Sequence, residues 1–306
     1  MEYSAAVFYP LGYPLEIATN SADVIAAARD DWGEYRQFFQ AAPVRLRIEV
    51  DERDAPLPGR TPVFQARANL VRIDCDESNI ACCDLVKGEG FGRFSTAAAR
   101  DADWLGYHFL EAMAYSMIDA AAFTAVHAGC VSLEGRGVLF CGDSGAGKST
   151  LAYACAREGW TFVADDASHL IRGQNVAAGA PHKLRLREPA KLLFPELQDR
   201  EARVRPNGKT TIEIRTAEMP GIRTAVQAEV RSIAFLNRRS GPAKARRFTR
   251  EEAARRPVEI LSAAEGEILD AQAAALRELM KAEVFELSYE HTGAAIELLS
   301  KIVRDS

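Results

Sequence analysis

Long hydrophobic runs and an excess of basic residues are both missing from this sequence. No uninterrupted apolar stretch approaches the ~18 residues that a membrane-spanning helix needs, so we expect no transmembrane segment. The 306 residues carry a net charge of −5, which gives no reason to expect binding to nucleic acid or to an anionic membrane. The opening stretch MEYSAAVFYPLGYP lacks a basic region followed by a long apolar segment, so we expect no secretory signal and a cytoplasmic protein.

Cysteine is sparse, and the spacings that a zinc site or a redox motif would use are absent. The six cysteines form no C-x-x-C pair, and several stand in apolar runs such as VLFCG and LAYACA. Buried free thiols in a reducing compartment explain this pattern better than disulfides or a metal site.

The length and the patterning of the chain predict two domains, residues 1–124 and residues 125–306. The first is expected to be an α+β module, because Val- and Ile-rich alternating segments precede a block with an apolar residue every fourth position over 101–123. Its strands are expected at 45–51, 63–74 and 79–86. No residue of this module carries evident chemistry, so substrate recognition, oligomer contacts or neither remain open for it.

The second domain alternates strand-like and helix-like segments, which predicts an α/β core around a central sheet. A hairpin from Val126 leads into a glycine-rich loop, a helix ending near Gly159, and a buried strand that ends in two acids. Later segments are expected as strands at 210–215, 230–238 and 284–290 and as helices at 265–282 and 292–304. The basic run 238–247 has Gly and Pro at its middle and is expected to form a solvated loop, with a patch for phosphate or an acidic partner as the alternative.

The stretch LFCGDSGAGKSTLA contains G-x-x-x-x-G-K-S, the pattern of a loop that wraps phosphates. Its glycines let successive N–H groups point at phosphate oxygens, and the following helix adds its positive N-terminal end. Lys148 is expected to hold the β and γ phosphates of ATP, and Ser149 to bind Mg²⁺. The residues expected to line the nucleotide are Gly142, Asp143, Ser144, Gly145, Ala146, Gly147, Lys148, Ser149 and Thr150.

Two acids and a histidine flank this loop in the sequence. Asp165 and Asp166 stand at the end of an apolar strand, where a carboxylate can hold the metal or accept the proton of a phosphoryl acceptor; capping of a turn is the alternative. His127 precedes the first strand of the hairpin. Taken alone, it and His169 fit a structural role better than a catalytic one.

The run from His127 to Leu170, HAGCVSLEGRGVLFCGDSGAGKSTLAYACAREGWTFVADDASHL, resembles the core of the HPr kinase/phosphorylase family. The resemblance implies the phosphate-loop fold shared with ATP-dependent phosphoenolpyruvate carboxykinases, with ATP and Mg²⁺ in the site. It further implies Asp165 as the catalytic base, Asp166 as a support for the base or the metal, and His127 beside the transferred phosphate. It implies as well a protein or peptide acceptor with a serine hydroxyl, and assembly into a homo-oligomer.

Two departures from the family pattern limit what is carried over. Thr150 follows GKS where the family usually has Glu, and the nearest match to its Glu-Ile-Arg-Gly segment is Glu213-Ile214-Arg215 followed by Thr216, far downstream. We therefore expect a divergent, HPr-kinase-like enzyme that transfers the γ-phosphoryl group of ATP to a hydroxyl, and the reverse phosphorylase reaction stays open. A small-molecule kinase on the same fold and a non-catalytic nucleotide-binding regulator remain the alternatives.

Overall fold

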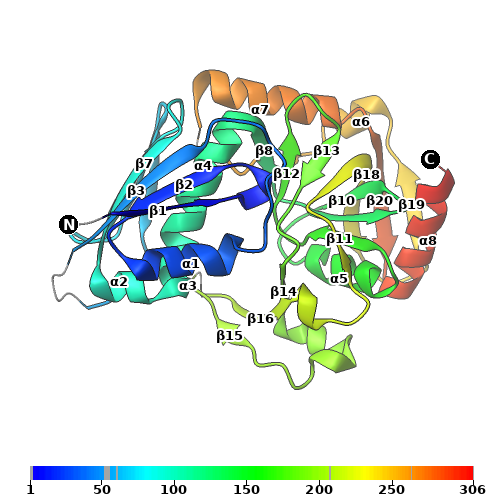
Figure 1. Ribbon diagram of the computed structural model, residues 1–306. Helices are drawn as coiled ribbons and strands as arrows, with labels where there is room; N and C mark the ends of the chain where they lie inside the picture. Colours follow the sequence, from blue (N-terminus) through cyan, green and yellow to red (C-terminus); the bar gives the residue numbers. More distant parts are fainter. Residues whose placement is uncertain (1–2, 52–55, 60, 207, 263, 306) are drawn as a thin grey trace. The chain divides into compact units, whose positions relative to one another are not determined.

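A computed structural model of the protein describes residues 3–51, 56–59, 61–206, 208–262 and 264–305. The fold is mixed α/β, as the sequence predicts (Figure 1). The chain divides into two compact units, which are treated separately below. Unit 1 comprises residues 1–123, 206–209 and 262–270, and unit 2 comprises residues 124–205, 210–261 and 271–306. Unit 1 is thus assembled from three separate stretches of sequence.

Unit 1 is built on a seven-stranded sheet in the order β1-β2-β3-β7-β6-β5-β4. Its strands are β1 (Ser4–Phe8), β2 (Leu15–Thr19), β3 (Val44–Asp51), β4 (Val63–Arg67), β5 (Leu70–Asp74), β6 (Ile80–Asp84) and β7 (Glu89–Ser95). Its helices are α1 (Ala22–Trp32), α2 (Thr96–Arg100), α3 (Ala102–Leu105) and α4 (Glu111–Ala122), with a 3₁₀ turn at Pro10–Gly12 and a π-helical turn at Gly106–Leu110. The pairs β2–β3 and β3–β7 are parallel, and the other pairs are antiparallel.

One face of the unit 1 sheet forms a core, because buried and exposed side chains alternate along its strands. In β3 the buried positions are Val44, Leu46, Ile48 and Val50. Helices α1 and α4 pack on this sheet, α1 against β1 and β2 and α4 against β3 and β6. The sheet and these helices therefore bury apolar side chains between them.

Two sequence predictions for unit 1 need comment. The single strand expected over 63–74 is wrong: it is the hairpin β4–β5, turned at Ala68, whose φ of 53° lies in the left-handed region. The helix expected over 101–123 is confirmed, and the Asp101 side chain caps it by accepting a hydrogen bond from the N–H of Trp104 at 2.9 Å. The π-helical turn inside this helix was not expected.

Unit 2 contains a ten-stranded sheet and a separate three-stranded sheet. The large sheet has the strands β8 (Phe123–Val126), β9 (Gly129–Leu133), β10 (Arg136–Cys141), β11 (Thr161–Ala164), β12 (Ser168–Ile171), β13 (Val176–Ala178), β17 (Arg223–Thr224), β18 (Gln227–Arg238), β19 (Lys244–Arg247) and β20 (Glu283–Tyr289). The small sheet has β14 (Lys183–Arg187), β15 (Arg203–Val204) and β16 (Thr210–Arg215). The helices are α5 (Lys148–Arg157), α6 (Arg250–Ala254), α7 (Gly266–Leu279), which begins within unit 1, and α8 (Thr292–Asp305), with 3₁₀ turns at Glu188–Leu192, Pro195–Leu197 and Thr216–Glu218.

The centre of the large sheet is β10, which pairs parallel with β18 and antiparallel with β9. Strand β18 in turn pairs parallel with β20, and β9 pairs on its other side with β11. The apolar run of β10 is buried on both faces. Val138 and Phe140 belong to one core, which includes residues of α5 and α8, whereas Leu139 and Cys141 belong to a second core on the opposite face. A central strand covered on both sides explains why this run is continuously apolar instead of alternating.

One loop predicted for unit 2 is partly a strand. Within the basic run 238–247, residues 244–247 form β19, which pairs antiparallel with β20. Small Ala245 alternates with Lys244 and Arg246, and such an alternation of apolar and polar residues suits an edge strand. The Gly and Pro of this run still fall in the connection that precedes β19.

Candidate functional site

The glycine-rich loop connects the end of β10 to the start of α5, as the sequence predicts. Gly142, Gly145 and Gly147 all have positive φ angles, of 143°, 90° and 99°. Gly147 is the residue that caps the N-terminus of α5. The first N–H groups of a helix have no partner within that helix and carry a partial positive charge, so this geometry suits an anion.

Two of these glycines stand where a side chain would have little room. A Cβ atom on Gly147 would lie 3.0 Å from the Tyr289 hydroxyl, and one on Gly142 would lie 3.4 Å from the carbonyl oxygen of Leu236. By contrast, a Cβ on Gly145 would meet no atom within 4 Å. The loop is therefore supported by β18 and β20 at its ends and open at its middle, which fits a cradle for phosphate groups.

Lys148 is the first residue of α5 and is 5% exposed. Its ammonium group donates hydrogen bonds to the carbonyl oxygens of Gly142 at 2.7 Å and of Asp143 at 3.2 Å, so it bends back over the loop. Burial lowers the pKa of Lys148, and the nearby carboxylate of Asp166 opposes that change. A buried ammonium with only carbonyl partners is well placed to bind an added anion.

Asp165 follows the last residue of β11 and reaches the same loop. Its carbonyl oxygen accepts a hydrogen bond from the Ser149 hydroxyl at 3.4 Å, and its Oδ2 atom accepts one from the backbone N–H of Arg185 at 2.7 Å. Burial raises the pKa of Asp165 to about 6, although the Arg185 N–H favours the ionised form. Its pKa therefore lies close to the range in which a general base works best.

Asp166 and His127 form the other part of the site. The His127 Nδ1 atom lies 3.5 Å from Asp166 Oδ1, with the histidine side chain 21% exposed and the aspartate 69% exposed. The backbone N–H of His127 donates a hydrogen bond to the backbone carbonyl oxygen of Glu259 at 3.0 Å. The structure thus brings His127, Asp165 and Asp166 together beside the glycine loop.

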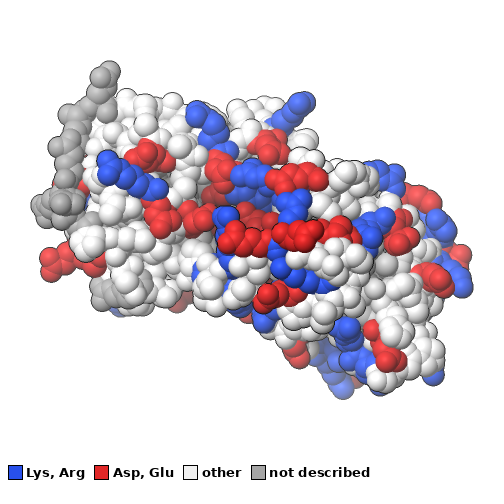
Figure 2. Space-filling view, turned by 90° about the horizontal axis from the view of Figure 1, so that it is seen from below, with Lys and Arg blue, Asp and Glu red and all other residues white. Residues whose placement is uncertain are grey.

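His169 is buried in β12, paired opposite Ala178. The cysteines agree with the sequence prediction: all six are free thiols, and all except Cys82 are buried. Within the described ranges no group of three or more His, Cys, Asp or Glu residues could hold a metal ion, and no helix has the length and apolarity to cross a bilayer. On the face drawn in Figure 2, acidic and basic side chains are interspersed.

The sequence did not identify which arginines approach the site. The Arg187 guanidinium donates to the Ser144 hydroxyl at 3.4 Å, at the middle of the glycine loop. The Arg185 side chain forms an ion pair with Glu213 at 2.9 Å, while the backbone N–H of the same arginine donates to the Asp165 carboxylate. Arg136 instead donates to carbonyl oxygens at the C-terminal end of α8. The positions of Arg185 and Arg187 depend on the pairing of β14 with β16, and no local sequence motif predicts that pairing.

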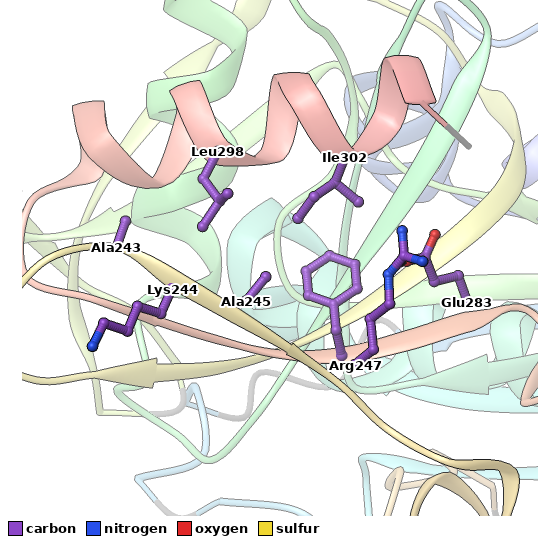
Figure 3. Close-up of a pocket in the computed structure, with 8 residues that line it drawn as sticks. Ala243, Lys244, Ala245, Arg247, Glu283, Leu298 and Ile302 are labelled. Atoms are coloured by element: carbon purple, nitrogen blue, oxygen red, sulfur yellow. Dashed lines mark ion pairs between the residues drawn. The ribbon is translucent and has the colours of Figure 1, made fainter.

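A separate cavity of about 490 Å³ opens between α8 and the strands β19 and β20 (Figure 3). Leu298 and Ile302 of α8 point from the helix toward the strands, and Ala245 lines the opposite wall. The ion pair of Arg247 with Glu283, at 2.6 Å, stands at one end. No residue of the predicted site lines this cavity.

Comparison with known proteins connects this site to one family. Residues 119–186 match the sequence profile described as the HPr Serine kinase C-terminal domain. Among solved structures, the Hpr(Ser) kinase/phosphatase from Coxiella burnetii is similar with 16% identity, over 59% of this chain and 88% of that chain, at a TM-score of 0.33. No curated protein matches the chain. The matched segment contains the glycine loop, His127 and both aspartates, so the similarity to the HPr Serine kinase C-terminal domain falls on the predicted site.

Proposed function

We propose that the protein is an ATP-dependent kinase that transfers the γ-phosphoryl group to a hydroxyl, with a serine of a protein or peptide as the acceptor. The observation that carries the proposal is the position of Asp165 next to the glycine-loop motif. Its backbone carbonyl oxygen accepts a hydrogen bond from the Ser149 hydroxyl, and its carboxylate accepts one from the backbone N–H of Arg185. A nucleotide-binding loop alone would not need a half-buried carboxylate whose pKa is raised to about 6. A base beside the phosphate site is what phosphoryl transfer to a hydroxyl requires.

The residues of the loop fit a nucleotide with a bound metal ion. The N–H groups at the start of α5 and the ammonium of Lys148 would hold the phosphates, and the Ser149 hydroxyl with the exposed Asp166 carboxylate would hold Mg²⁺. Mg²⁺ is commonly bound by one or two protein oxygens together with substrate phosphates, so this small donor set is sufficient. The ion would supply positive charge to the phosphate oxygens.

In the transfer step the acceptor oxygen forms a bond to the γ-phosphorus, and the bond from that phosphorus to the β–γ bridging oxygen breaks. Asp165 accepts the proton of the acceptor hydroxyl, with its carboxylate orientation fixed by the Arg185 N–H. His127 is positioned by Asp166 at the edge of the site, where it can contact the transferred group. Positioning and charge stabilisation supply most of the acceleration in such reactions.

The test is the Asp165→Asn variant, incubated with γ-labelled ATP and a panel of serine-containing peptides, HPr, free serine and sugars. Loss of transfer with nucleotide affinity within about threefold of the unmodified protein is expected, because only the proton acceptor is removed. Asp199→Asn removes an exposed carboxylate in the same unit and serves as the control. Equal loss of transfer and of ATP binding would contradict the assignment of Asp165 as the base.

A further inference from the structure

Strand β14 contacts the proposed site at two places, the proposed base Asp165 and the glycine loop. At Arg185 its backbone holds the Asp165 carboxylate, and two residues later the Arg187 guanidinium contacts Ser144 of the glycine loop. Leu184 and Leu186 between them are 2% and 1% exposed, and both belong to the core that also contains residues of α5. Because side chains alternate along a strand, Arg185 and Arg187 share the opposite face, roughly 7 Å apart. The strand thus extends from the proposed base to the loop that would hold the phosphates.

The charges of the arginines on this side are compensated to different extents. Glu213 pairs with Arg185 at 2.9 Å and also with Arg205, so the Arg185 charge is already neutralised. In contrast, no carboxylate partner is recorded for Arg187 among the residues that the structure describes, and its side chain is exposed. Its one recorded hydrogen bond is to a neutral hydroxyl, at the long distance of 3.4 Å. An uncompensated guanidinium at the rim of an anion site is available to a phosphate group.

We propose that Arg187 is a catalytic residue, whose guanidinium binds the phosphoryl group during its transfer; this rests on the kinase function proposed above. Negative charge spreads over the equatorial oxygens of the transferred group, and the planar guanidinium can donate to two of them at once. To do so, Arg187 exchanges its weak bond to Ser144 for phosphate oxygens. The backbone need not move, because β14 is held by its pairing with β16, in which Arg187 lies opposite Thr211.

The test compares two ligands on purified full-length protein: Mg·ADP alone, and Mg·ADP with aluminium fluoride, which imitates the transferred group. In the unmodified protein, aluminium fluoride should tighten ADP binding. In Arg187→Gln, the tightening of ADP binding by aluminium fluoride should be smaller by a factor on the order of 10². The Kd of Mg·ADP alone should stay within about threefold, because the arginine acts on the transferred group. Arg187→Lys should retain a part of the effect, since it keeps the charge and loses the bidentate geometry.

Arg203→Gln is the matched control, because Arg203 lies in the same small sheet and pairs with the exposed Glu201. It should bind both ligands as the unmodified protein does. Tightening by aluminium fluoride that survives in Arg187→Gln would overturn the role of Arg187 and leave the kinase proposal standing. An equal weakening of both ligands would overturn it as well, since it would show ground-state binding only. An unmodified protein that does not bind Mg·ADP at all would overturn the kinase proposal and this inference together.

Discussion

Burial raises the pKa of thiols and phenols in both units, and in unit 2 it also shifts the pKa of a cation and of an acid near the glycine loop. In unit 1, burial raises the pKa of the Tyr115 phenol and of the Cys83 thiol, so that both stay neutral around pH 7. In unit 2, burial lowers the pKa of Lys148, which follows the glycine loop, and raises to about 6 the pKa of Asp165, whose carbonyl oxygen is bonded to the neighbouring Ser149. Shifts of the first kind need no function, whereas an acid and a cation shifted beside one loop are typical of a catalytic site.

The strongest test of this contrast is Lys148→Ala. The Lys148 ammonium is bonded to two carbonyl oxygens of the loop, and charge-assisted bonds to phosphate are strong. We expect the Kd of Mg·ATP, measured by calorimetry, to rise by about 100-fold or more, which corresponds to roughly 3 kcal/mol. Lys244→Ala removes an exposed lysine of β19 and should leave the affinity unchanged. Equal affinities in the two variants would count against nucleotide binding by this loop.

A second test asks whether unit 1 can be weakened without affecting the site in unit 2. Asn79 is fully buried, and its side chain accepts a bond from the Ser95 N–H at 3.0 Å and donates to Asp76 at 2.9 Å. Asn79→Ala removes the acceptor of the buried Ser95 N–H, so the free energy of unfolding should fall by about 2 kcal/mol. Urea denaturation measures that loss, and calorimetry with Mg·ADP should show an unchanged Kd. A large drop in nucleotide affinity under native conditions would contradict the expectation that unit 1 can be weakened without affecting the site in unit 2.

The sequence predicted the parts of the site that depend on local chemistry. Gly142, Gly147 and Lys148 lie within one contiguous motif, and Asp165 follows one helix and one strand later, so their proximity could be inferred without tertiary information. The roles of these residues remain predictions. Likewise, the apolar period over 101–123 was enough to locate a helix, because packing and periodicity agree there.

What the sequence did not predict depends on pairing between distant segments. Arg187 reaches the glycine loop because β14 pairs with β16 from more than 20 residues away, and no local pattern fixes that register. The sequence predicts a loop where β19 forms, because the basic residues and the preceding Gly and Pro outweigh its short alternation. The turn at Ala68 was missed because a non-glycine residue rarely adopts a positive φ.

The smallest expected effect concerns the cost of keeping Asp165 ionised. Its pKa in the folded protein, about 6, lies above the ordinary value of 3.8, so the folded state holds the proton more tightly than the unfolded chain does. The ionised carboxylate therefore lowers stability increasingly as the pH rises from about 4 to 6, and fully above pH 6. Asp165→Asn keeps an oxygen for the Arg185 N–H and removes the charge, so it should stabilise the protein by about 1–2 kcal/mol at pH 8.

Thermal or urea unfolding of Asp165→Asn at pH 4, 6 and 8 measures this effect, which should shrink toward zero at pH 4. Asp199→Asn, with its exposed carboxylate, should show no such dependence. In the unmodified protein, phosphoryl transfer should rise with pH through about 6 and then level off, because the base must be deprotonated. A variant that loses activity and gains stability over the same pH range would mark Asp165 as a group retained for chemistry at the expense of the fold. A loss of stability at pH 8 would instead make the Asp165 carboxylate a structural element, and the contrast with the neutral buried groups of unit 1 would disappear.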